Sequence, residues 1–379
     1  GEAYKDGKFG KAEYIKAKEI FEMSAKFGNS DSIYFIGQLY HDGAGVVQDY
    51  CKAFEYYKMS AEMGNSFAYI KIGNLYLHGR GVAEDYSMAK KYYKKSAELG
   101  NSEGLNGLAA ICFRNNENDE GIAYIKKSAE QNNVYGLIRL GNIYLRGILI
   151  DHNFDEAKRL YEKAALLNES EGYIGLGAIY LRGLGTDKNY NLAKYNFEQA
   201  AYLGNSNAYI RLGHMYMHGF GVTRNYVKAK EYFEISAKKG NSNALINLGI
   251  LYLYGLGVEQ DFLKTKKFFE MAGKKNNSDA LCGIGFLYLM GLGVEKNFDM
   301  AKEYFEKSIR KENYNAYIYI GNMYFLGQGV EKNWTEGNEY YNKYIKGKNN
   351  FQNFYQGKQY YYGYGGKTDY ALAIDYFKK

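Results

Sequence analysis

Apolar and polar positions follow the period of an α-helix in short segments of this chain, and a glycine-containing break follows each segment. From Phe67 to Leu77, apolar residues recur every three or four positions, and residues 78–82 interrupt the pattern. A second helical segment runs from Tyr86 to Glu98, and Gly100 and Asn101 close it. The pattern therefore predicts a helix (helix A), a short loop, a second helix (helix B) and a turn.

This pattern returns about every 36 residues. Glycines mark the interval, apart from one gap between Gly73 and Gly141, within which Ala109 takes the equivalent position and four residues are missing. The glycines stand at positions 37, 73, 141, 177, 213, 249, 285, 321 and 357. Because one hairpin cannot bury both of its faces, stacked neighbours must bury them, which predicts a solenoid.

We expect a single all-α domain over residues 1–379, a right-handed α–α superhelix of about ten helix-loop-helix repeats, with no room for another domain. The expected units are 1–30 (partial), 31–66, 67–102, 103–134 (short), 135–170, 171–206, 207–242, 243–278, 279–314, 315–350 and 351–379 (partial).

Helix B begins with the same signal in nearly every unit. An Asp or Asn, whose side chain can accept a hydrogen bond from the first turn, precedes an aromatic residue. These caps stand at positions 49, 85, 153, 189, 225, 261, 297, 333 and 369. Helix B commonly ends in Gly-Asn, which suits a left-handed residue after a helix.

Glycine inside helix A costs roughly 1 kcal/mol relative to alanine, yet it recurs in nearly every unit. We interpret it as a point of close backbone contact between the two helices. Small residues recur 16 positions later in helix B, as Ala89 follows Gly73. A tyrosine three residues after the glycine also recurs, as at Tyr76, which indicates shared packing.

The pattern A-x4-G-x2-Y-x2-G-x-G-V-x2-D-[YF]-x2-A, seen from Ala68 to Ala89, resembles the Sel-one-like repeat, a relative of the tetratricopeptide repeat. The resemblance covers essentially the whole chain. It implies a right-handed superhelical solenoid with helix A on the concave side, and adaptors or scaffolds without enzymatic chemistry. The cysteine-rich bacterial branch of that family is disfavoured, because Cys51, Cys112 and Cys282 form no periodic pairs.

Some units depart from the pattern. Residues 115–119 replace the glycine loop of the third unit, where we expect a change of superhelical twist, and Leu149 replaces the second loop glycine of the fourth. Ile309 and Ile345 replace a usual alanine. The chain begins at a helix-A glycine and stops within a helix B, so we expect the natural protein to be longer or its ends to pack on something else.

Composition narrows the classes of protein. Apolar residues make up 46% of the chain, which excludes wholesale disorder, and no apolar run reaches the length of a membrane span. The net charge of +7 is spread among 49 basic and 42 acidic residues, without a charged block. This balance disfavours a dedicated nucleic-acid binder. No signal peptide is recognisable at the start of the chain.

Candidate chemistry is sparse. The recurring Gly-x-Gly loops have neither the preceding strand nor the GK[ST] sequence of a nucleotide site, so we interpret them as turns. His214 and His218 stand one helical turn apart, but zinc needs three or four ligands. No catalytic arrangement is recognisable, and the sequence predicts no enzyme activity, no cofactor and no metal.

The helix-A positions that vary between repeats are the candidates for binding. The middle units carry basic residues there and the later units apolar and aromatic ones. We expect these to form a groove with a cationic centre for the acidic groups of a protein or peptide partner and an aromatic stretch for an apolar anchor. The predicted partner-binding residues are Arg139, Arg146, Arg182, Arg211, His214, His218, Tyr254, Phe286, Tyr319 and Tyr355.

A non-enzymatic interaction scaffold is thus the first prediction. The alternatives are an anionic polymer or nucleic acid bound by the central arginines, or a bacterial secreted or envelope effector of the same family. A small metal or enzyme site around His214 and His218 is a third class. Binding through the arginines to a polyanion would weaken steeply with salt, which distinguishes it from peptide binding.

Overall fold

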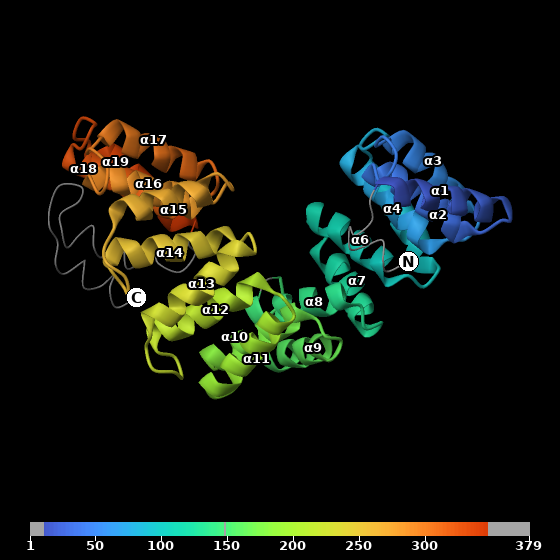
Figure 1. Ribbon diagram of the computed structural model, residues 1–379, viewed down its shortest axis with the longest axis horizontal. Coiled ribbons are helices and arrows are strands. Elements are labelled where there is room, and N and C mark those ends of the chain that lie inside the picture. The colour runs from blue at the N-terminus through green and yellow to red at the C-terminus, as the bar shows by residue number, and fades with distance from the viewer. Residues whose placement is uncertain (1–10, 148, 348–379) are drawn as a thin grey trace. The chain divides into compact units, whose positions relative to one another are not determined.

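The computed structural model describes residues 11–147 and 149–347, and every regular element in this part of the chain is an α-helix (Figure 1). The 19 helices alternate between helix A and helix B, which confirms the predicted all-α repeat fold. The first predicted unit is described only from residue 11, and the last one, residues 351–379, lies outside the described residues. None of the described helices is long and apolar enough to span a membrane.

The chain divides into two compact units, residues 1–189 and 190–379, and each is described by itself. In unit 1 the A helices are α2 (Ser30–Asp42), α4 (Ser66–His78), α6 (Ser102–Arg114), α8 (Val134–Arg146) and α10 (Ser170–Arg182). Its B helices are α1 (Lys11–Lys26), α3 (Tyr50–Glu62), α5 (Tyr86–Glu98), α7 (Asn118–Glu130) and α9 (Phe154–Leu166).

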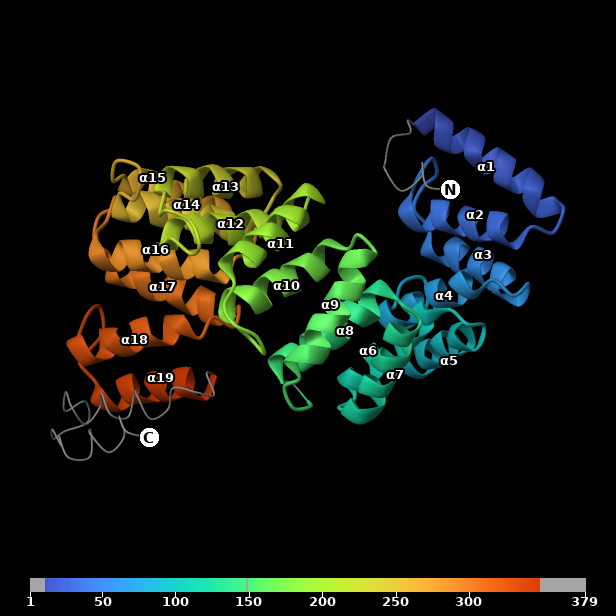
Figure 2. The same ribbon diagram turned by 90° about the horizontal axis from the view of Figure 1, so that it is seen from below.

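Unit 2 repeats the same order. Its A helices are α12 (Ser206–His218), α14 (Ser242–Tyr254), α16 (Ser278–Met290) and α18 (Asn315–Leu326). Its B helices are α11 (Tyr190–Tyr202), α13 (Tyr226–Lys238), α15 (Phe262–Gly273), α17 (Phe298–Ile309) and α19 (Trp334–Gly347). Consecutive hairpins such as α14–α15 and α16–α17 pack against each other in the stack (Figure 2).

Side-chain caps start both kinds of helix. Asp49 accepts the backbone N–H of Lys52 at 3.0 Å at the start of α3, as the sequence predicted. Asn65 closes α3 as expected, because its backbone N–H donates to the Ser60 carbonyl at 3.2 Å, and it also caps α4, because its Oδ1 accepts the N–H of Ala68 at 3.2 Å. At the end of α4, Gly79 takes the left-handed conformation (φ 61°) and its N–H donates to the Leu75 carbonyl. Local hydrogen bonds therefore fix the boundaries of each hairpin.

The cap asparagines also join one repeat to the next. Asn65 donates its Nδ2 proton to Asp31 at 2.8 Å, across the boundary between two repeats. Asn101 donates in the same way to Ser66 Oγ at 3.1 Å, and Asn277 to Ser242 Oγ at 3.0 Å. The recurring asparagine therefore starts its own helix A and ties that helix to the preceding one.

Close packing explains the glycine inside helix A. A Cβ at Gly73 would lie 2.5 Å from the ring of Tyr93 on α5, and a Cβ at Gly107 of the next repeat would lie 2.6 Å from the same ring. The equivalent rings of Tyr161 and Phe269 are held in the same way between two glycines. The close contact predicted from the sequence is confirmed, and the group that the glycine contacts is the aromatic ring four residues after the small residue of helix B.

The departures from the pattern follow the same packing. In the short repeat, Ile125 takes the place of the ring, and the buried Ala109 packs with Ile125 in one core cluster. Leu149 adopts φ 72°, close to the φ of 66° at Gly185 in the next loop. The loop therefore requires a left-handed residue at this place, which supports its interpretation as a turn. The expected change of twist in the third unit stays a prediction.

Candidate partner-binding surface

The A helices of neighbouring repeats contact one another. In unit 1, α4 contacts α6 and α8 contacts α10, and in unit 2, α16 contacts α18. They form a layer within each unit, and the predicted binding residues that the structure describes belong to these A helices. Arg139, Arg146 and Arg182 belong to unit 1, and the others that the structure describes belong to unit 2.

Two of the predicted arginines share a pocket in unit 1. Arg139 and Arg146 line a cavity of about 310 Å³ together with Phe113, Asn142 and Leu149. The Cζ of Arg139 lies 5.4 Å from the centre of the Phe113 ring, within the range of a cation–π contact. Both guanidinium groups are exposed, so the pocket offers two cations beside an apolar wall. Arg182 is also exposed, at the last residue of α10.

The predicted basic residues of unit 2 lie on α12. Arg211 and His218 are exposed, whereas His214 is half-buried beside Phe233, with ring centres 5.4 Å apart. Burial, reinforced by the positive charges of His218 and Arg211, lowers the pKa of His214 to about 4. His214 is therefore neutral at pH 7. The two histidine rings stack with centres 5.9 Å apart.

The predicted aromatic stretch of unit 2 is only partly open. Tyr254 has 64% of its surface exposed at the end of α14. Phe286 is half-buried in a core cluster, and Tyr319 stacks on Phe305 of α17 with ring centres 4.9 Å apart. Packing inside the unit therefore occupies part of the surface of Phe286 and Tyr319. Tyr355 lies outside the described residues.

One of the variable positions of helix A also serves packing. Asn74, Asn142 and Asn322 follow the repeat glycine, and each accepts the hydroxyl proton of a helix-B tyrosine. The distances are 2.6 Å from Tyr93, 2.8 Å from Tyr161 and 2.7 Å from Tyr341. Where the ring is phenylalanine, as at Phe233, Phe269 and Phe305, the A-helix residue is His214, Ile250 or Phe286. Variation at this position therefore follows the partner ring.

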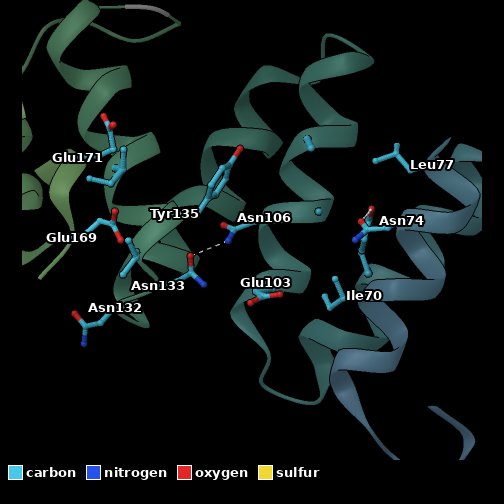
Figure 3. A pocket seen from close by; sticks show the side chains of 15 residues that line it. Ile70, Asn74, Leu77, Glu103, Asn106, Asn132, Asn133, Tyr135, Glu169 and Glu171 are labelled. Atoms are coloured by element: carbon cyan, nitrogen blue, oxygen red, sulfur yellow. Dashed lines mark hydrogen bonds between the residues drawn. The ribbon is translucent and has the colours of Figure 1, made fainter. Parts of the chain in front are cut away.

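A larger groove in unit 1 was not foreseen from the sequence. It has a volume of about 860 Å³ and crosses α4, α6 and α8 to the start of α10 (Figure 3). Ile70, Leu77 and Ile138 contribute apolar surface to it. The charged residues among its lining are Glu103, Glu169 and Glu171, and the lining has no lysine, arginine or histidine.

An asparagine pair crosses this groove. Asn106 donates its Nδ2 proton to Asn133 Oδ1 at 2.9 Å (Figure 3). Asn106 Oδ1 is buried, and no group among the described residues donates a hydrogen bond to it. Six other A helices carry isoleucine at the equivalent position, three residues before the repeat glycine: Ile70, Ile138, Ile174, Ile210, Ile246 and Ile318. The other two described A helices carry Tyr34 and Cys282 there, so Asn106 is the one amide at this position and the signal that could have pointed to the groove.

Comparisons with known proteins agree with this geometry. The Sel1 repeat model matches residues 30–65, 66–101, 104–133, 134–169, 170–205, 206–241, 242–277, 278–313, 315–345 and 357–379. The chain belongs to the Sel1 repeat family. Ten matched repeats confirm the family that the sequence pattern indicated, including the short third unit. Among curated proteins, no sequence matches the chain.

Two solved structures of Sel1 repeat proteins resemble the chain. One is c5321, a protective antigen present in uropathogenic Escherichia coli strains displaying an SLR fold; it has 28% identity and a TM-score of 0.54, over 94% of this chain and 78% of that one. The other is a Sel1 repeat protein from Oxalobacter formigenes, with 22% identity and a TM-score of 0.57, over 80% of this chain and 90% of that one. Sel1 repeats commonly serve as scaffolds for protein interaction.

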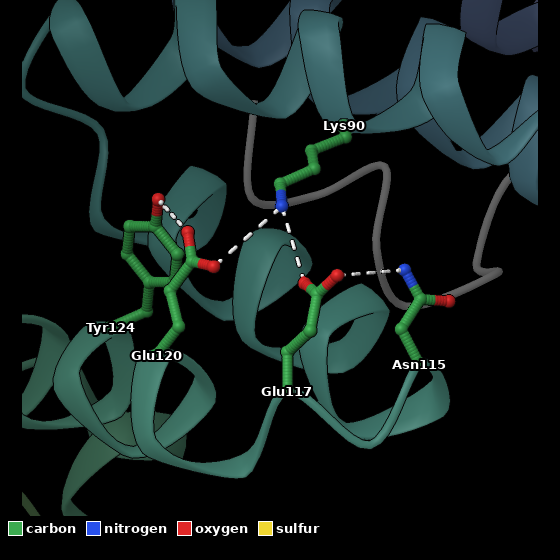
Figure 4. Close-up of polar contacts among 5 residues, drawn as sticks. All are labelled: Lys90, Asn115, Glu117, Glu120 and Tyr124. Atoms are coloured by element: carbon green, nitrogen blue, oxygen red, sulfur yellow. Dashed lines mark hydrogen bonds and ion pairs between the residues drawn. The ribbon is translucent and has the colours of Figure 1, made fainter.

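The short Sel1 repeat also brings together a group that could hold a metal. The ligand atoms of Cys112, Glu117 and Glu120 lie within 4.8 Å of one another. The described residues contain no other group of three or more such ligands, and His214 and His218 belong to none. Lys90 Nζ lies 3.3 Å from Glu117 Oε2 and 3.8 Å from Glu120 Oε2 (Figure 4).

The positive charge of Lys90 compensates the negative charges of Glu117 and Glu120. Burial, together with the neighbouring Glu117, raises the pKa of the Cys112 thiol to about 11, so the thiol is protonated at pH 7 and is a poor metal ligand. The ammonium of Lys90 supplies the positive charge that the two carboxylates would otherwise take from a cation. We therefore interpret the cluster as a link between α5 and α7 that replaces the missing glycine loop.

Proposed function

We propose that the chain is a non-enzymatic scaffold that binds a segment of a partner protein on its A-helix layer. The observation that carries the proposal is the pocket in which Arg139 and Arg146 lie together beside Phe113 and Leu149. Two guanidinium groups can bind a carboxylate through charge-assisted hydrogen bonds, while the apolar wall accepts a neighbouring side chain. An acidic residue next to an apolar one in the partner fits this pocket.

The remaining predicted residues are part of the same proposal, and those that the structure describes each lie on the A-helix layer of their own unit. Arg182 adds an exposed cation on α10, and Arg211 and His218 add polar groups on α12 of unit 2. Tyr254, with its exposed ring, and the accessible edges of His214, Phe286 and Tyr319 would provide apolar contacts. Tyr355 belongs to the same proposal by its place in the sequence pattern. A preformed helical layer supports binding with little rearrangement of the backbone.

Affinity capture tests this function. The intact chain and the Arg139→Gln/Arg146→Gln variant are used to retain proteins from a cell lysate of the source organism, with Arg159→Gln as a control. Arg159 is also an exposed arginine of unit 1, but it lies on α9 and pairs with Glu156. We expect at least one protein to be retained by the intact chain and the control and lost, by tenfold or more, with the double variant. Equal retention by all three would reject the arginine pocket.

The salt dependence of the captured complex separates a peptide from a polyanion. A protein segment held by two arginines should lose affinity shallowly between 50 and 200 mM salt, whereas a nucleic acid or another polyanion loses roughly 1000-fold or more when it makes six or more phosphate contacts. A steep slope would therefore favour the polyanion alternative.

A further inference from the structure

The groove of unit 1 has a charge opposite to that of the chain. The chain carries a net charge of +7, yet every charged residue that lines this groove is a glutamate. Glu103 and Glu169 form no ion pair with any described residue. Figure 3 shows Glu103 on α6 near the middle of the groove, with Glu169 at one side. A cationic group would gain favourable contacts here that the protein itself does not provide.

The orientation of the asparagine pair leaves a buried acceptor unsatisfied at the wall of the same groove. Asn133 Oδ1 accepts the N–H of Gly136 at 3.0 Å, and Asn133 Nδ2 donates to Ser102 Oγ at 2.9 Å. These bonds fix the Asn133 amide, so the atom of Asn106 that faces its Oδ1 must be Nδ2. Asn106 Oδ1 is then the buried atom without a donor. A buried acceptor without a donor destabilises a fold unless a ligand supplies the missing hydrogen bond.

The comparison between repeats shows that the fold does not need this polar group. Isoleucine stands at the equivalent position of six other A helices, including α4 and α8 on either side of α6. Asn106 therefore replaces an apolar packing residue by one that leaves an acceptor unsatisfied. Local departures from a rule that the rest of the fold obeys are expected at binding sites.

We propose that the groove of unit 1 binds an extended, cationic segment of a partner protein. Lysine or arginine side chains of the segment face Glu103 and Glu169, and apolar side chains pack against Ile70, Leu77 and Ile138. The side chain of Asn106 turns toward the groove on binding, so that its Oδ1 accepts a backbone N–H of the segment. The proposal rests on the scaffold function and adds the chemistry of one partner segment. Roughly eight extended residues would cross the groove, given helix spacings of about 9 Å and 3.3 Å per residue.

A library of random 12-residue peptides displayed on phage, selected against the intact full-length chain, provides the probe. Selected peptides are then synthesised, and their affinities are measured for the Arg139→Gln/Arg146→Gln variant and for three further variants. Glu103→Gln/Glu169→Gln removes the charges, and Asn106→Ile installs the residue of the other repeats. Glu62→Gln/Glu98→Gln removes two exposed glutamates of α3 and α5 as a matched control. Circular dichroism checks that each variant keeps its helix content and thermal midpoint.

We expect selected peptides enriched in lysine and arginine between apolar residues. Their affinity should fall at least tenfold with Glu103→Gln/Glu169→Gln and several-fold with Asn106→Ile, and should not change with the control. The thermal midpoint of Asn106→Ile should equal or exceed that of the intact chain, which a merely structural role of Asn106 would not allow.

Selected peptides without an excess of basic residues, or with equal affinity for the intact chain and the groove variants, would overturn the proposal. Selection of no binding peptide would overturn it as well. Peptides that lose affinity only with Arg139→Gln/Arg146→Gln would leave the scaffold function standing and reject the groove. Loss of both capture through the arginines and peptide binding would reject the scaffold function itself.

Discussion

The tyrosine–asparagine pairs show how a single hydroxyl determines a residue on the facing helix. Asn74, Asn142 and Asn322 each accept a hydroxyl proton from the tyrosine 19 positions later. The first repeat has a tyrosine without this arrangement, because Gln38 stands in place of the asparagine, and the buried hydroxyl of Tyr57 has no partner among the described residues. Burial raises the pKa of both Tyr57 and Tyr161 far above its ordinary value, so both hydroxyls are protonated and able to donate.

Removing these two hydroxyls should therefore have different effects. Tyr161→Phe deletes a hydrogen bond of 2.8 Å to Asn142 and should lower the free energy of unfolding by about 1 kcal/mol. Tyr57→Phe deletes a buried hydroxyl without a partner and should leave the stability unchanged or slightly higher. Urea unfolding followed by circular dichroism measures both. An equal loss in the two variants would contradict the assigned role of the pair.

At this level the sequence reveals packing better than it reveals binding. The repeated glycine predicted close contact between the two helices, because a residue that disfavours helices recurs at the same place in nearly every unit and needs one structural reason. It did not show that Tyr319 stacks on Phe305 or that Asn142 pairs with Tyr161, because both positions vary between repeats. From the sequence we interpret the variable helix-A positions as binding positions, but part of their variation compensates for changes in the facing helix B.

Each hairpin is held together where a helix-A glycine meets helix B. The ring of Tyr161 lies where a Cβ at Gly141 would come within 2.9 Å of it, so the two helices cannot approach as closely with any larger residue. In α6, Ala109 stands in place of the glycine and faces Ile125, which stands in place of the ring. The methyl group of Ala109 fills space that a ring occupies in the other repeats. The choice between glycine and alanine therefore depends on the facing residue.

Opposite substitutions at this equivalent position should both destabilise the fold. Gly141→Ala improves helix propensity but forces a methyl group against Tyr161, with a net cost of about 1–3 kcal/mol. Ala109→Gly removes a buried methyl group and lowers helix propensity, with a cost of about 1–2 kcal/mol. Thermal unfolding of the two variants measures these effects. A stabilising Gly141→Ala would show that the ring can move aside and that close contact is not needed.

The helices themselves could be predicted almost to the residue, because their signals are local. The predicted segment Tyr86–Glu98 is α5, and Phe67–Leu77 differs from α4 by one residue at each end. The groove of unit 1 could not be predicted in this way, since it depends on which side chains of α4, α6 and α8 converge in space. The sequence shows that Asn106 departs from the isoleucine of other repeats, but that its Oδ1 lacks a donor follows only from the orientation of the Asn133 amide in the structure.

Charge is unevenly distributed over the protein. The chain as a whole is basic, but unit 1 carries a pocket with two arginines and a groove with three glutamates, both reached from α6 and α8. A partner segment that fits both would need basic and acidic residues in a fixed order. Electrostatic complementarity of this kind contributes more to specificity and association rate than to affinity.

The stability of unit 2 should depend on pH through His214. Its pKa is about 4 in the fold, below the ordinary value of 6.5, so the unfolded chain binds the proton first as the pH falls. The contribution of His214 is therefore complete above pH 6.5 and is lost progressively down to pH 4, by at most roughly 3 kcal/mol. Trp334 is the only tryptophan of the chain and lies on α19 of unit 2, so its fluorescence reports urea unfolding of this unit.

His214→Phe provides the matched variant, because Phe286 occupies the same position above Phe305 in another repeat. The loss of stability between pH 6.5 and pH 4 should be smaller in this variant than in the intact chain. The same pH dependence in both proteins would show that His214 is as free to take a proton in the fold as in the unfolded chain.

The ring held between two glycines has a consequence for how such a chain can change in length. Gly73 belongs to the same repeat as Tyr93, whereas Gly107 belongs to the next one, so the contact straddles the boundary between repeats. In a tandem duplication of residues 67–102, Lys71 of the second copy would take the place of Gly107 after the ring of the first copy, as it now follows the ring of Tyr57. The junction between the two copies would repeat a junction that the chain already has, so gene duplication could lengthen the array here without a compensating mutation.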